Sequence, residues 1–417
     1  MKSIGVIGGG ISGVSFARMI GDNANVHIYE KQPIIGGLIR CDRVNGYLYH
    51  LVGGHLFNAK NPQILKWFWN FFNADTEFIK AERKAKIFLN NTLVGYPIED
   101  HIFQLDKHTA KAVINELVSK DKKDAEDFES FLLNNFGNTL HQLYFKPYNE
   151  KIWNTDLSKV PLPWLEGKLP MPAVNDILLN NIFRQQETKM VHSWFYYPKV
   201  NGSQFLIDRL AQGLKITTGF QVRKIEKTAD GLFINDEGPF NHIVYTGDVR
   251  QLASCVDGLI PSSLAKKISS LQSNGTTNVL CTCDANDLSW LYIPEEKFRA
   301  HRIVYTGNFS ATNNLKDGRI SCTVEFSNFV SEEQVKKEIK DLPGNMEFLA
   351  YNFEPNSYII QNAETRELIN EYREILEDSN IFLLGRFAEW EYYNMDKAME
   401  AAWVLSDKLG YIVENNA

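Results

Sequence analysis

The first thirty residues place a glycine-spaced turn between two short apolar runs. A strand-like run leads into the spacing G-x-G-x-x-G from Gly8 to Gly13, and an apolar helical pattern follows before a second strand at 25–29 ends at Glu30. The first glycine permits a tight turn, the second lets the backbone approach a pyrophosphate at the helix N-terminus, and the third lets the helix pack on the strand. A carboxylate at the end of the second strand can accept hydrogen bonds from ribose hydroxyls. This order predicts a dinucleotide site, against the alternative of a bare structural turn. The residues assigned to it are Gly8, Gly10, Ile11, Ser12, Gly13 and Glu30.

A second pair of glycines lies just beyond the ribose-binding acid. Glu30-Lys31 is followed by Gly36-Gly37, an extension that a plain nicotinamide dehydrogenase does not need. It resembles the E-x5-G-G extension of the large FAD-binding family that includes the amine oxidases. The alternative is an ordinary loop that happens to contain two glycines. We therefore expect FAD as the cofactor in place of NAD, with Lys31, Gly37 and Leu38 also in its site.

Composition limits the other kinds of function. The 417 residues carry a formal net charge of −7 and contain no basic run, which argues against a nucleic-acid partner. Aromatic residues make up 12% of the chain, which suits a protein that encloses flat rings. The five cysteines are scattered and form no C-x-x-C pair, so we expect no metal site and a reducing compartment. No run approaches about 18 apolar residues, so we expect no membrane span and a cytoplasmic protein.

The order of expected elements divides the chain into three parts. The expected fold class is α/β, with an FAD-binding Rossmann-like domain, an inserted helical domain and an antiparallel β-sheet domain. Residues 1–60, 194–275 and 376–417 are assigned to the FAD-binding domain. Residues 61–193 are expected to be mainly helical and to cover the substrate, with a β-hairpin near 84–98 that turns at Asn90-Asn91. Residues 276–375 carry several strand-like runs and are assigned to a substrate-side sheet.

The segment from Leu384 to Asp396 combines a strand end, a loop and the start of a helix. A strand that ends in Gly385-Arg386, followed by a loop and a helix, places backbone N–H groups where a flavin ring could lie. Asn394 and Asp396 fit as helix N-terminal caps. The alternative is simple capping beside a surface arginine. The cofactor residues expected in this segment are Arg386, Tyr393, Asn394 and Met395.

Several segments resemble, in order along the chain, those of the UDP-galactopyranose mutases. GRFAEWEYYNMDKAMEAA, from Gly385 onward, is similar to their GR-x-G-x-(W/Y)-RY-x-x-x-D segment. GGHLF, which includes Gly54, His55 and Leu56, resembles their GGH-x-F loop over the flavin. These flavin-site matches are shared with the amine oxidases.

Other matches are more specific to the mutases. FKPYNEKIW, ending at Trp153, resembles F-x-x-PYN-x-KVW, and WLYIPE with the following His301-Arg302 resembles WLY-x-PE and its arginine. Shorter matches are Gly95-Tyr96-Pro97, to the YP hairpin, and NFS at 308–310, to N-(Y/F)-SP. The segment at Tyr358 is a weaker match to a later tyrosine segment. The resemblance therefore covers essentially the whole chain.

The resemblance implies a mutase that interconverts the pyranose and furanose forms of a nucleotide-diphosphate sugar, such as UDP-galactose or dTDP-fucose, for cell-surface polysaccharide biosynthesis. In that reaction the N5 atom of reduced FAD attacks the anomeric carbon and the nucleoside diphosphate leaves. The sugar–flavin adduct opens to an iminium, recloses through another hydroxyl and recaptures the diphosphate, with no net redox change. The flavin acts as a covalent nucleophile, while the protein binds and orients. The implied partners are the nucleotide-sugar and an external reductant for the flavin, and a homodimer is compatible with the resemblance.

The resemblance also implies roles for individual residues. Arg302 is expected on the diphosphate, because a guanidinium fork matches phosphate oxygens. Lys168, in WLEGKLP, stands where the mutases carry a second arginine on a mobile flap. His55 is expected near flavin N5. The predicted catalytic residues are His55, Arg302 and Lys168. The predicted substrate-binding residues are Tyr96, Tyr148, Asn149, Trp153, Lys168, Tyr292, Arg302, Tyr358 and Tyr392. From local features alone, the aromatic residues also fit as core packing, Arg302 as a surface strand residue and His55 as part of a capped turn.

Three positions depart from the mutase pattern, and other functions stay open. Lys168 keeps the charge of an arginine but loses its fork, Glu391 replaces an arginine, and Leu51 replaces an aspartate. These changes put UDP-galactose itself in question and are compatible with a deoxy sugar on dTDP. The alternative function is a flavin oxidoreductase of the amine-oxidase or protoporphyrinogen-oxidase type, which needs no diphosphate clamp. A catalytically idle flavoprotein scaffold is the third reading.

Overall fold

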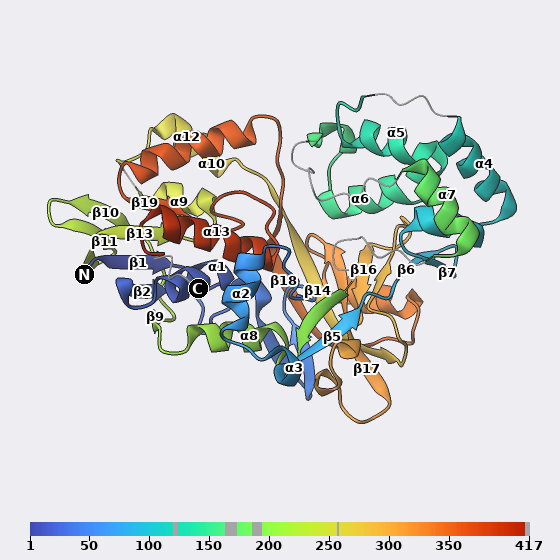
Figure 1. Ribbon diagram of the computed structural model, residues 1–417, viewed down its shortest axis with the longest axis horizontal. Helices are drawn as coiled ribbons and strands as arrows, with labels where there is room; N and C mark the ends of the chain where they lie inside the picture. The colour runs from blue at the N-terminus through green and yellow to red at the C-terminus, as the bar shows by residue number, and fades with distance from the viewer. Residues whose placement is uncertain (120–123, 163–172, 186–193, 257, 413–417) are drawn as a thin grey trace.

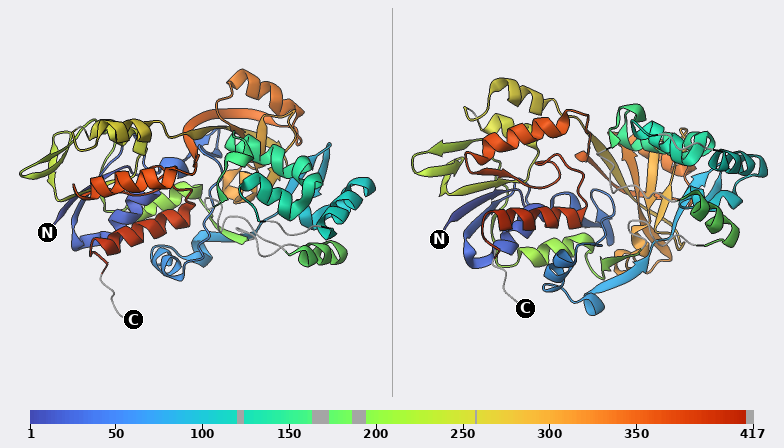
Figure 2. Two further views of the ribbon diagram at one scale, coloured as in Figure 1. Left: turned by 90° about the horizontal axis from the view of Figure 1, so that it is seen from above. Right: turned by 45° about the horizontal axis from the view of Figure 1, so that its top comes forward.

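The computed structural model describes residues 1–119, 124–162, 173–185, 194–256 and 258–412. Its fold is α/β, with a Rossmann-like part at one end and a mixed sheet covered by helices at the other, as Figures 1 and 2 show. Within these described residues, no helix is both long enough and apolar enough to cross a lipid bilayer.

A five-stranded parallel sheet forms the nucleotide-binding end. Its strands lie in the order β19-β13-β1-β2-β9, and each neighbouring pair is parallel. Both faces of a parallel sheet are covered, which is why β1 and β13 are short apolar runs with almost no exposed residue. The strands are β1 (Ser3–Ile7), β2 (Asn25–Tyr29), β9 (Lys215–Thr217), β13 (His242–Tyr245) and β19 (Ile381–Leu383).

Different elements cover the two faces of this sheet. One face packs on four helices, α1 (Ile11–Ile20), α2 (Pro62–Trp69), α8 (Gly202–Ala211) and α13 (Met395–Lys408). The other packs on a small antiparallel sheet, β10 (Ile225–Thr228), β11 (Gly231–Ile234) and β12 (Glu237–Phe240), and on helices α9 (Val249–Cys255), α10 (Ser262–Ser269) and α12 (Thr365–Glu377). The residues that connect β1 to α1 and that follow β2 and β19 therefore meet at one edge of the sheet.

A seven-stranded sheet forms the opposite end, in the order β18-β14-β17-β16-β15-β6-β7. All neighbours are antiparallel except β15 and β6, which are parallel. Side chains alternate between its faces: Trp290, Tyr292 and Val304 face the helices, whereas Leu291 and Ile303 face the core under α11 (Glu332–Glu338). The strands are β6 (Ala85–Leu89), β7 (Thr92–Gly95), β14 (Ser273–Asp284), β15 (Trp290–Tyr292), β16 (Ala300–Val304), β17 (Arg319–Ser327) and β18 (Glu347–Ile359).

Helices α4 (Lys107–Val118), α5 (Phe128–Leu140), α6 (Lys146–Trp153) and α7 (Val174–Phe183) lie over one face of this sheet. The side chains of Asp106 and Asp127 accept hydrogen bonds from backbone N–H groups in the first turns of α4 and α5, so these caps fix where both helices begin. The remaining elements are α3 (Ala74–Glu77) and two antiparallel pairs, β3 (Cys41–Val44) with β4 (Tyr47–His50) and β5 (Phe78–Glu82) with β8 (Trp194–Pro198).

The structure differs from the predicted division of the chain at three places. The predicted hairpin exists, with Asn90 and Asn91 at positive φ in its turn, but its strand β6 pairs with β15 and so extends the substrate-side sheet. The expected boundary at residues 375/376 falls inside α12, which packs in the core of the nucleotide-binding end. Strand β8, at the start of a segment assigned to the FAD-binding domain, pairs with β5 and lies outside the parallel sheet.

Candidate active site

The three glycines of the first turn are each required by a different close approach. A Cβ on Gly13 would lie 2.2 Å from the Gly8 carbonyl oxygen, and one on Gly8, at φ +111°, would lie 2.2 Å from Thr246 Oγ1. Among the described residues, a Cβ on Gly10 would meet only Gly37 Cα, at 3.8 Å, so the space in front of Gly10 is open there. Gly10 is the N-cap of α1, whose first N–H groups have no acceptor within the helix. This open helix N-terminus is the geometry that a pyrophosphate needs.

Glu30 lies directly beside this turn. Its carboxylate is buried and accepts hydrogen bonds from the N–H groups of Gly9, at 2.7 Å, and Gln32, at 2.8 Å. Each carboxylate oxygen has a second acceptor position, so both can still accept bonds from ribose hydroxyls. Gly36 bonds through its N–H to the Gly9 carbonyl at 2.9 Å, which brings the second glycine pair against the first turn. Leu38, which follows that pair, is half-buried, and Lys31 is exposed.

The C-terminal loop reaches the same edge of the sheet. A Cβ on Gly385, at φ +96°, would lie 2.5 Å from Ser12 Oγ in α1. The Arg386 guanidinium donates to the Tyr393 carbonyl at 2.9 Å and to the Ser357 carbonyl at 3.1 Å, so it holds the loop against β18. Asn394 occupies the N-cap of α13, but its side chain makes no capping bond, contrary to expectation. Met395 begins the helix and is buried.

The His55 loop lies between the two ends of the molecule. The Nε2 atom of His55 is buried and has no hydrogen-bond partner among the described residues. Burial, together with the charge of Arg386, lowers the pKa of His55 to about 4, so the ring is neutral near pH 7. Gly54 packs closely on Val304 and Phe309, which fixes the loop on the seven-stranded sheet. A buried imidazole nitrogen with no partner is a position at which a bound group can donate or accept a hydrogen bond.

Arg302, on β16, is held by a carboxylate that the sequence analysis did not select. Its Nε and Nη2 atoms donate to Glu325 Oε2, on β17, at 2.9 and 2.5 Å. Burial alone would raise the pKa of Glu325, but the charge of Arg302 and a hydrogen bond from His301 outweigh it and lower the pKa to about 2. The Nη1 atom of Arg302 makes no hydrogen bond within the described part of the chain. One edge of the fork is therefore fixed and the other is left for a ligand.

Tyrosines surround Arg302. Tyr292 lies opposite Arg302 in the register of β15 and β16. Tyr148, on α6, packs edge-on against the Tyr292 ring, and the two ring centroids are 5.3 Å apart. Tyr96 lies on the other side, 4.7 Å from the Tyr292 ring. Burial raises the pKa of Tyr96 and Tyr148, and the nearby charge of Arg302 counteracts this only in part at Tyr148. These two hydroxyls thus keep their protons and remain hydrogen-bond donors.

A second aromatic wall connects this region to the C-terminal loop. The rings of Tyr358 and Tyr392 are stacked, with centroids 5.9 Å apart, and Trp153 packs edge-on against both. The Arg386 guanidinium lies 4.8 Å from the Tyr392 ring centroid. Asn149, one turn before Trp153, uses its amide group to donate to the Phe145 carbonyl at 2.7 Å. The structure therefore brings the predicted substrate residues together, next to the expected flavin loop. Lys168 lies outside the described residues.

Two further charged residues of this region were not selected from the sequence. Arg83, between β5 and β6, donates to the Tyr292 hydroxyl. Lys151, on α6, donates to the carbonyls of Ile293 at 2.9 Å, Glu295 at 2.6 Å and Ala300 at 3.3 Å, and so ties α6 to the hairpin that carries Tyr292 and Arg302. Lys151 lies inside the segment that resembles PYN-x-K-V-W, whereas Arg83 lies in a charged run that reads as surface.

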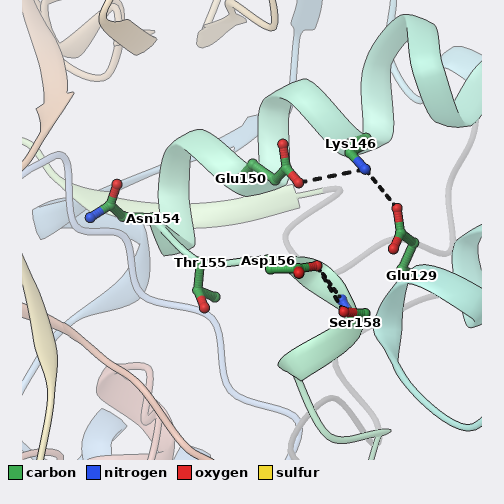
Figure 3. Close-up of a pocket in the computed structure, with 7 residues that line it drawn as sticks. All are labelled: Glu129, Lys146, Glu150, Asn154, Thr155, Asp156 and Ser158. Atoms are coloured by element: carbon green, nitrogen blue, oxygen red, sulfur yellow. Dashed lines mark hydrogen bonds and ion pairs between the residues drawn. The ribbon is translucent and has the colours of Figure 1, made fainter.

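A polar cavity in the helical part is a separate feature. Its volume is about 590 Å³, and it is lined by Glu129, Lys146, Glu150, Asn154, Thr155, Asp156 and Ser158 (Figure 3). Lys146 is paired there with Glu129 at 2.8 Å and Glu150 at 3.8 Å. Three carboxylates against one ammonium disfavour an anionic ligand. None of the predicted site residues lines this cavity, so it is not the candidate active site.

Known proteins resemble the chain in sequence and in fold. Residues 6–72 match the family model of the NAD(P)-binding Rossmann-like domain. A probable UDP-galactopyranose mutase from Klebsiella pneumoniae is 23% identical over 99% of this chain and 96% of its own, and a dTDP-fucopyranose mutase from Escherichia coli is 21% identical over 96% and 97%. The structure of a reduced UDP-galactopyranose mutase matches with a TM-score of 0.85 at 20% identity, covering 99% of this chain and 95% of that one. The structure of a putative protoporphyrinogen oxidase from Exiguobacterium sp. 255-15 matches with a TM-score of 0.74 at 12% identity, covering 98% of each chain.

The two sequence relatives named above are matched over nearly their full lengths, and both are mutases of nucleotide-linked sugars. The structural likeness includes both a mutase and an oxidase, and so shows the fold alone. The sequence matches distinguish the mutases from the oxidases, because the relatives matched over nearly their full lengths are sugar mutases. Over nearly its whole length, this chain is therefore similar in sequence to UDP-galactopyranose and dTDP-fucopyranose mutases, which are isomerases.

Proposed function

We propose that this protein is an FAD-dependent mutase that interconverts the pyranose and furanose forms of a sugar carried on a nucleoside diphosphate. The observation that carries the proposal is Arg302, a guanidinium fixed on one edge by Glu325, open on the other and enclosed by tyrosines. An oxidase of amines or of apolar substrates has no anion for such a group to bind. A nucleoside diphosphate supplies that anion.

The described residues fit a bound FAD. The open space at Gly10 and the N-terminus of α1 would receive the pyrophosphate, Glu30 the ribose, and the buried Nε2 of His55 a polar edge of the ring system. When bound and reduced, the flavin supplies the nucleophile for the anomeric carbon of the sugar. His55 is neutral near pH 7, so it can hydrogen-bond without adding a charge at this position.

Arg302 is proposed to stabilise the nucleoside diphosphate as it leaves the sugar. The fixed edge removes the freedom of the side chain before the substrate arrives, so the second edge is already oriented. In a site walled by aromatic rings, charge–charge attraction is screened less than in water. The hydroxyls of Tyr148 and Tyr358 are proposed to donate to the same anion, because burial raises the pKa of each.

The proposed substrates are UDP-galactose and related nucleotide-sugars such as dTDP-fucose. The experiment that decides is product analysis with dithionite-reduced protein and a panel of UDP- and dTDP-sugars. We expect one sugar to give a furanose product, with no reductant consumed in proportion to it. Consumption of NAD(P)H or oxygen in step with product would support the oxidoreductase alternative.

A matched pair of arginine variants tests the role of Arg302. Arg319, on the neighbouring strand β17, donates to the Thr282 Oγ1 atom at 3.0 Å and to the Thr282 carbonyl at 3.2 Å, and Thr282 is not a predicted site residue. Arg319→Ala should leave the kinetics on the true substrate close to normal, whereas Arg302→Ala should lower kcat about 10²- to 10³-fold. Near-normal kcat/KM for Arg302→Ala would refute the diphosphate assignment.

A further inference from the structure

Arg83 occupies an aromatic enclosure beside the candidate active site. It lies in the two-residue link between β5 and β6, and its guanidinium carbon is 4.7 Å from the ring centroid of Tyr96, 5.3 Å from that of Trp290 and 5.8 Å from that of Tyr292. Its Nη2 atom donates to the Tyr292 hydroxyl. The guanidinium thus meets the hydroxyls of Tyr292 and Tyr96 from inside an aromatic wall, which is not the setting of a solvated surface arginine.

Tyr292 links Arg83 to Arg302. Tyr292 and Arg302 are opposite residues on the antiparallel strands β15 and β16, so their side chains are neighbours on the same face of the sheet. Arg83 approaches the same tyrosine from the β6 side, since β6 pairs with β15. Tyr292 therefore lies between two arginines, Arg83 bonded to its hydroxyl and Arg302 beside it on the neighbouring strand.

The direction of the hydrogen bond decides what Tyr292 can do. Arginine is a donor only, so the Tyr292 oxygen accepts from Arg83 and its own proton is directed elsewhere. Tyr148 covers one side of the ring, with centroids 5.3 Å apart. A hydroxyl that accepts a hydrogen bond from a cation is polarised by it and is a stronger donor to an anion.

We infer that Arg83 is a positioning residue of the nucleotide site, which orients the Tyr292 hydroxyl and supplies a second guanidinium charge beside Arg302 for the phosphates of a nucleoside diphosphate. The inference rests on the proposed function. It also answers an electrostatic requirement: a chain of net charge −7 must concentrate positive charge locally to hold a dianionic ligand in an apolar site.

Binding of UDP and of uridine to the flavin-loaded protein separates the charge effect from packing. Removing a hydrogen bond to a charged group costs about 1.5–3 kcal/mol, so Arg83→Met should weaken UDP binding about 10- to 100-fold. Uridine carries no phosphate, and its affinity should change less than about threefold. Arg83→Lys keeps the charge but loses the fork, so its affinity for UDP should fall between those of the wild type and of Arg83→Met.

Tyr292→Phe shows whether Arg83 acts through the hydroxyl. If Arg83 acts through that hydroxyl, the loss of UDP affinity in the double variant Arg83→Met, Tyr292→Phe should be smaller than the product of the fold-losses in the two single variants. The control is Arg209→Met, which removes an arginine lying 5.1 Å from the Phe205 ring and bonded to Glu77, outside this site. That variant should bind UDP normally.

The outcomes distinguish this inference from the proposed function. Equal losses of UDP and uridine affinity in Arg83→Met, or additive effects with Tyr292→Phe, would overturn the role of Arg83. If Arg83→Met does not fold, unchanged UDP affinity in the folded Arg83→Lys variant would overturn it as well. If Arg302→Met also leaves UDP affinity unchanged, the diphosphate site itself is wrong, and the proposed function fails with it.

Discussion

Replacing Gly10 tests cofactor binding separately from folding. Gly10 has φ −79° and ψ −178°, a backbone conformation open to any residue, and a Cβ there has Gly37 Cα at 3.8 Å as its nearest neighbour. In Gly10→Val, the unfolded chain has less conformational entropy to lose, which stabilises the folded protein by about 0.4–1 kcal/mol. An apolar residue at the N-cap destabilises it by about the same amount. The free energy of unfolding of the flavin-free protein should therefore stay within about 1 kcal/mol of the wild type.

The same substitution should strongly weaken flavin binding. The valine side chain would occupy the space in front of the α1 N-terminus, where the pyrophosphate is proposed to lie. We expect at least a 100-fold loss of affinity, about 2.7 kcal/mol. Flavin content after purification and urea unfolding of the flavin-free protein measure the two effects.

Gly13→Ala provides the contrast. Its methyl group would lie 2.2 Å from the Gly8 carbonyl oxygen, so the backbone must shift and both stability and flavin content should fall. Full flavin occupancy in Gly10→Val would refute the binding site. A loss of stability as large as that of Gly13→Ala would refute the argument from open space.

Four further outcomes follow from the site. Arg302→Ala should lower kcat about 10²- to 10³-fold, the range typical of a lost transition-state donor, whereas Lys168→Ala should mainly raise KM, with an effect that fades at high salt; steady-state kinetics at two ionic strengths checks both. Lys151→Met should raise KM for the nucleotide-sugar while flavin content stays normal, because it frees α6 from the carbonyls that position it; normal KM would contradict this. The free energy of unfolding, measured in urea at each pH, should fall as pH drops from about 6.5 towards 4. The reason is that the pKa of His55 is lowered from 6.5 to about 4 in the folded protein, so over this range the unfolded chain binds a proton at His55 that the folded protein does not. A further loss, on the order of 3 kcal/mol, should occur as pH drops from about 4.5 towards 2 through Glu325; flat stability over both ranges would contradict the two shifts.

Features that depend on neighbouring residues could be predicted from the sequence. The spacing from Gly8 to Gly13 requires a particular turn whatever surrounds it, and the structure places Glu30 directly beside that turn. Asn90-Asn91 likewise specifies a hairpin turn locally, because asparagine tolerates positive φ at both positions. What this hairpin pairs with was not predicted, since the partner β15 is about two hundred residues away and no local signal selects it.

Residues whose role depends on a distant partner were missed for the same reason. Glu325 becomes part of the site only when β17 pairs with β16 and brings it to Arg302. One signal was present: a carboxylate within the apolar run RISCTVEFS is expensive to bury unless a cation faces it. Arg83 gave no such signal, because RKAK reads as a solvated run and two of its three aromatic neighbours, Trp290 and Tyr292, lie far along the chain.

Two of the three departures from the mutase pattern have interaction partners of their own within the described residues. Glu391 accepts from Gln361 at 3.0 Å and lies 3.4 Å from Arg366 on α12, so its charge is balanced within the nucleotide-binding end. Leu51 packs in a small apolar cluster with Tyr47 and Tyr49, and its carbonyl accepts from Asn352 at 2.8 Å. Both substitutions thus have a packing partner or counter-charge of their own and need no change of substrate to explain them. The question of which sugar the proposed mutase uses then passes from these positions to the groups that face the tyrosines, where Arg83 supplies a second guanidinium fork.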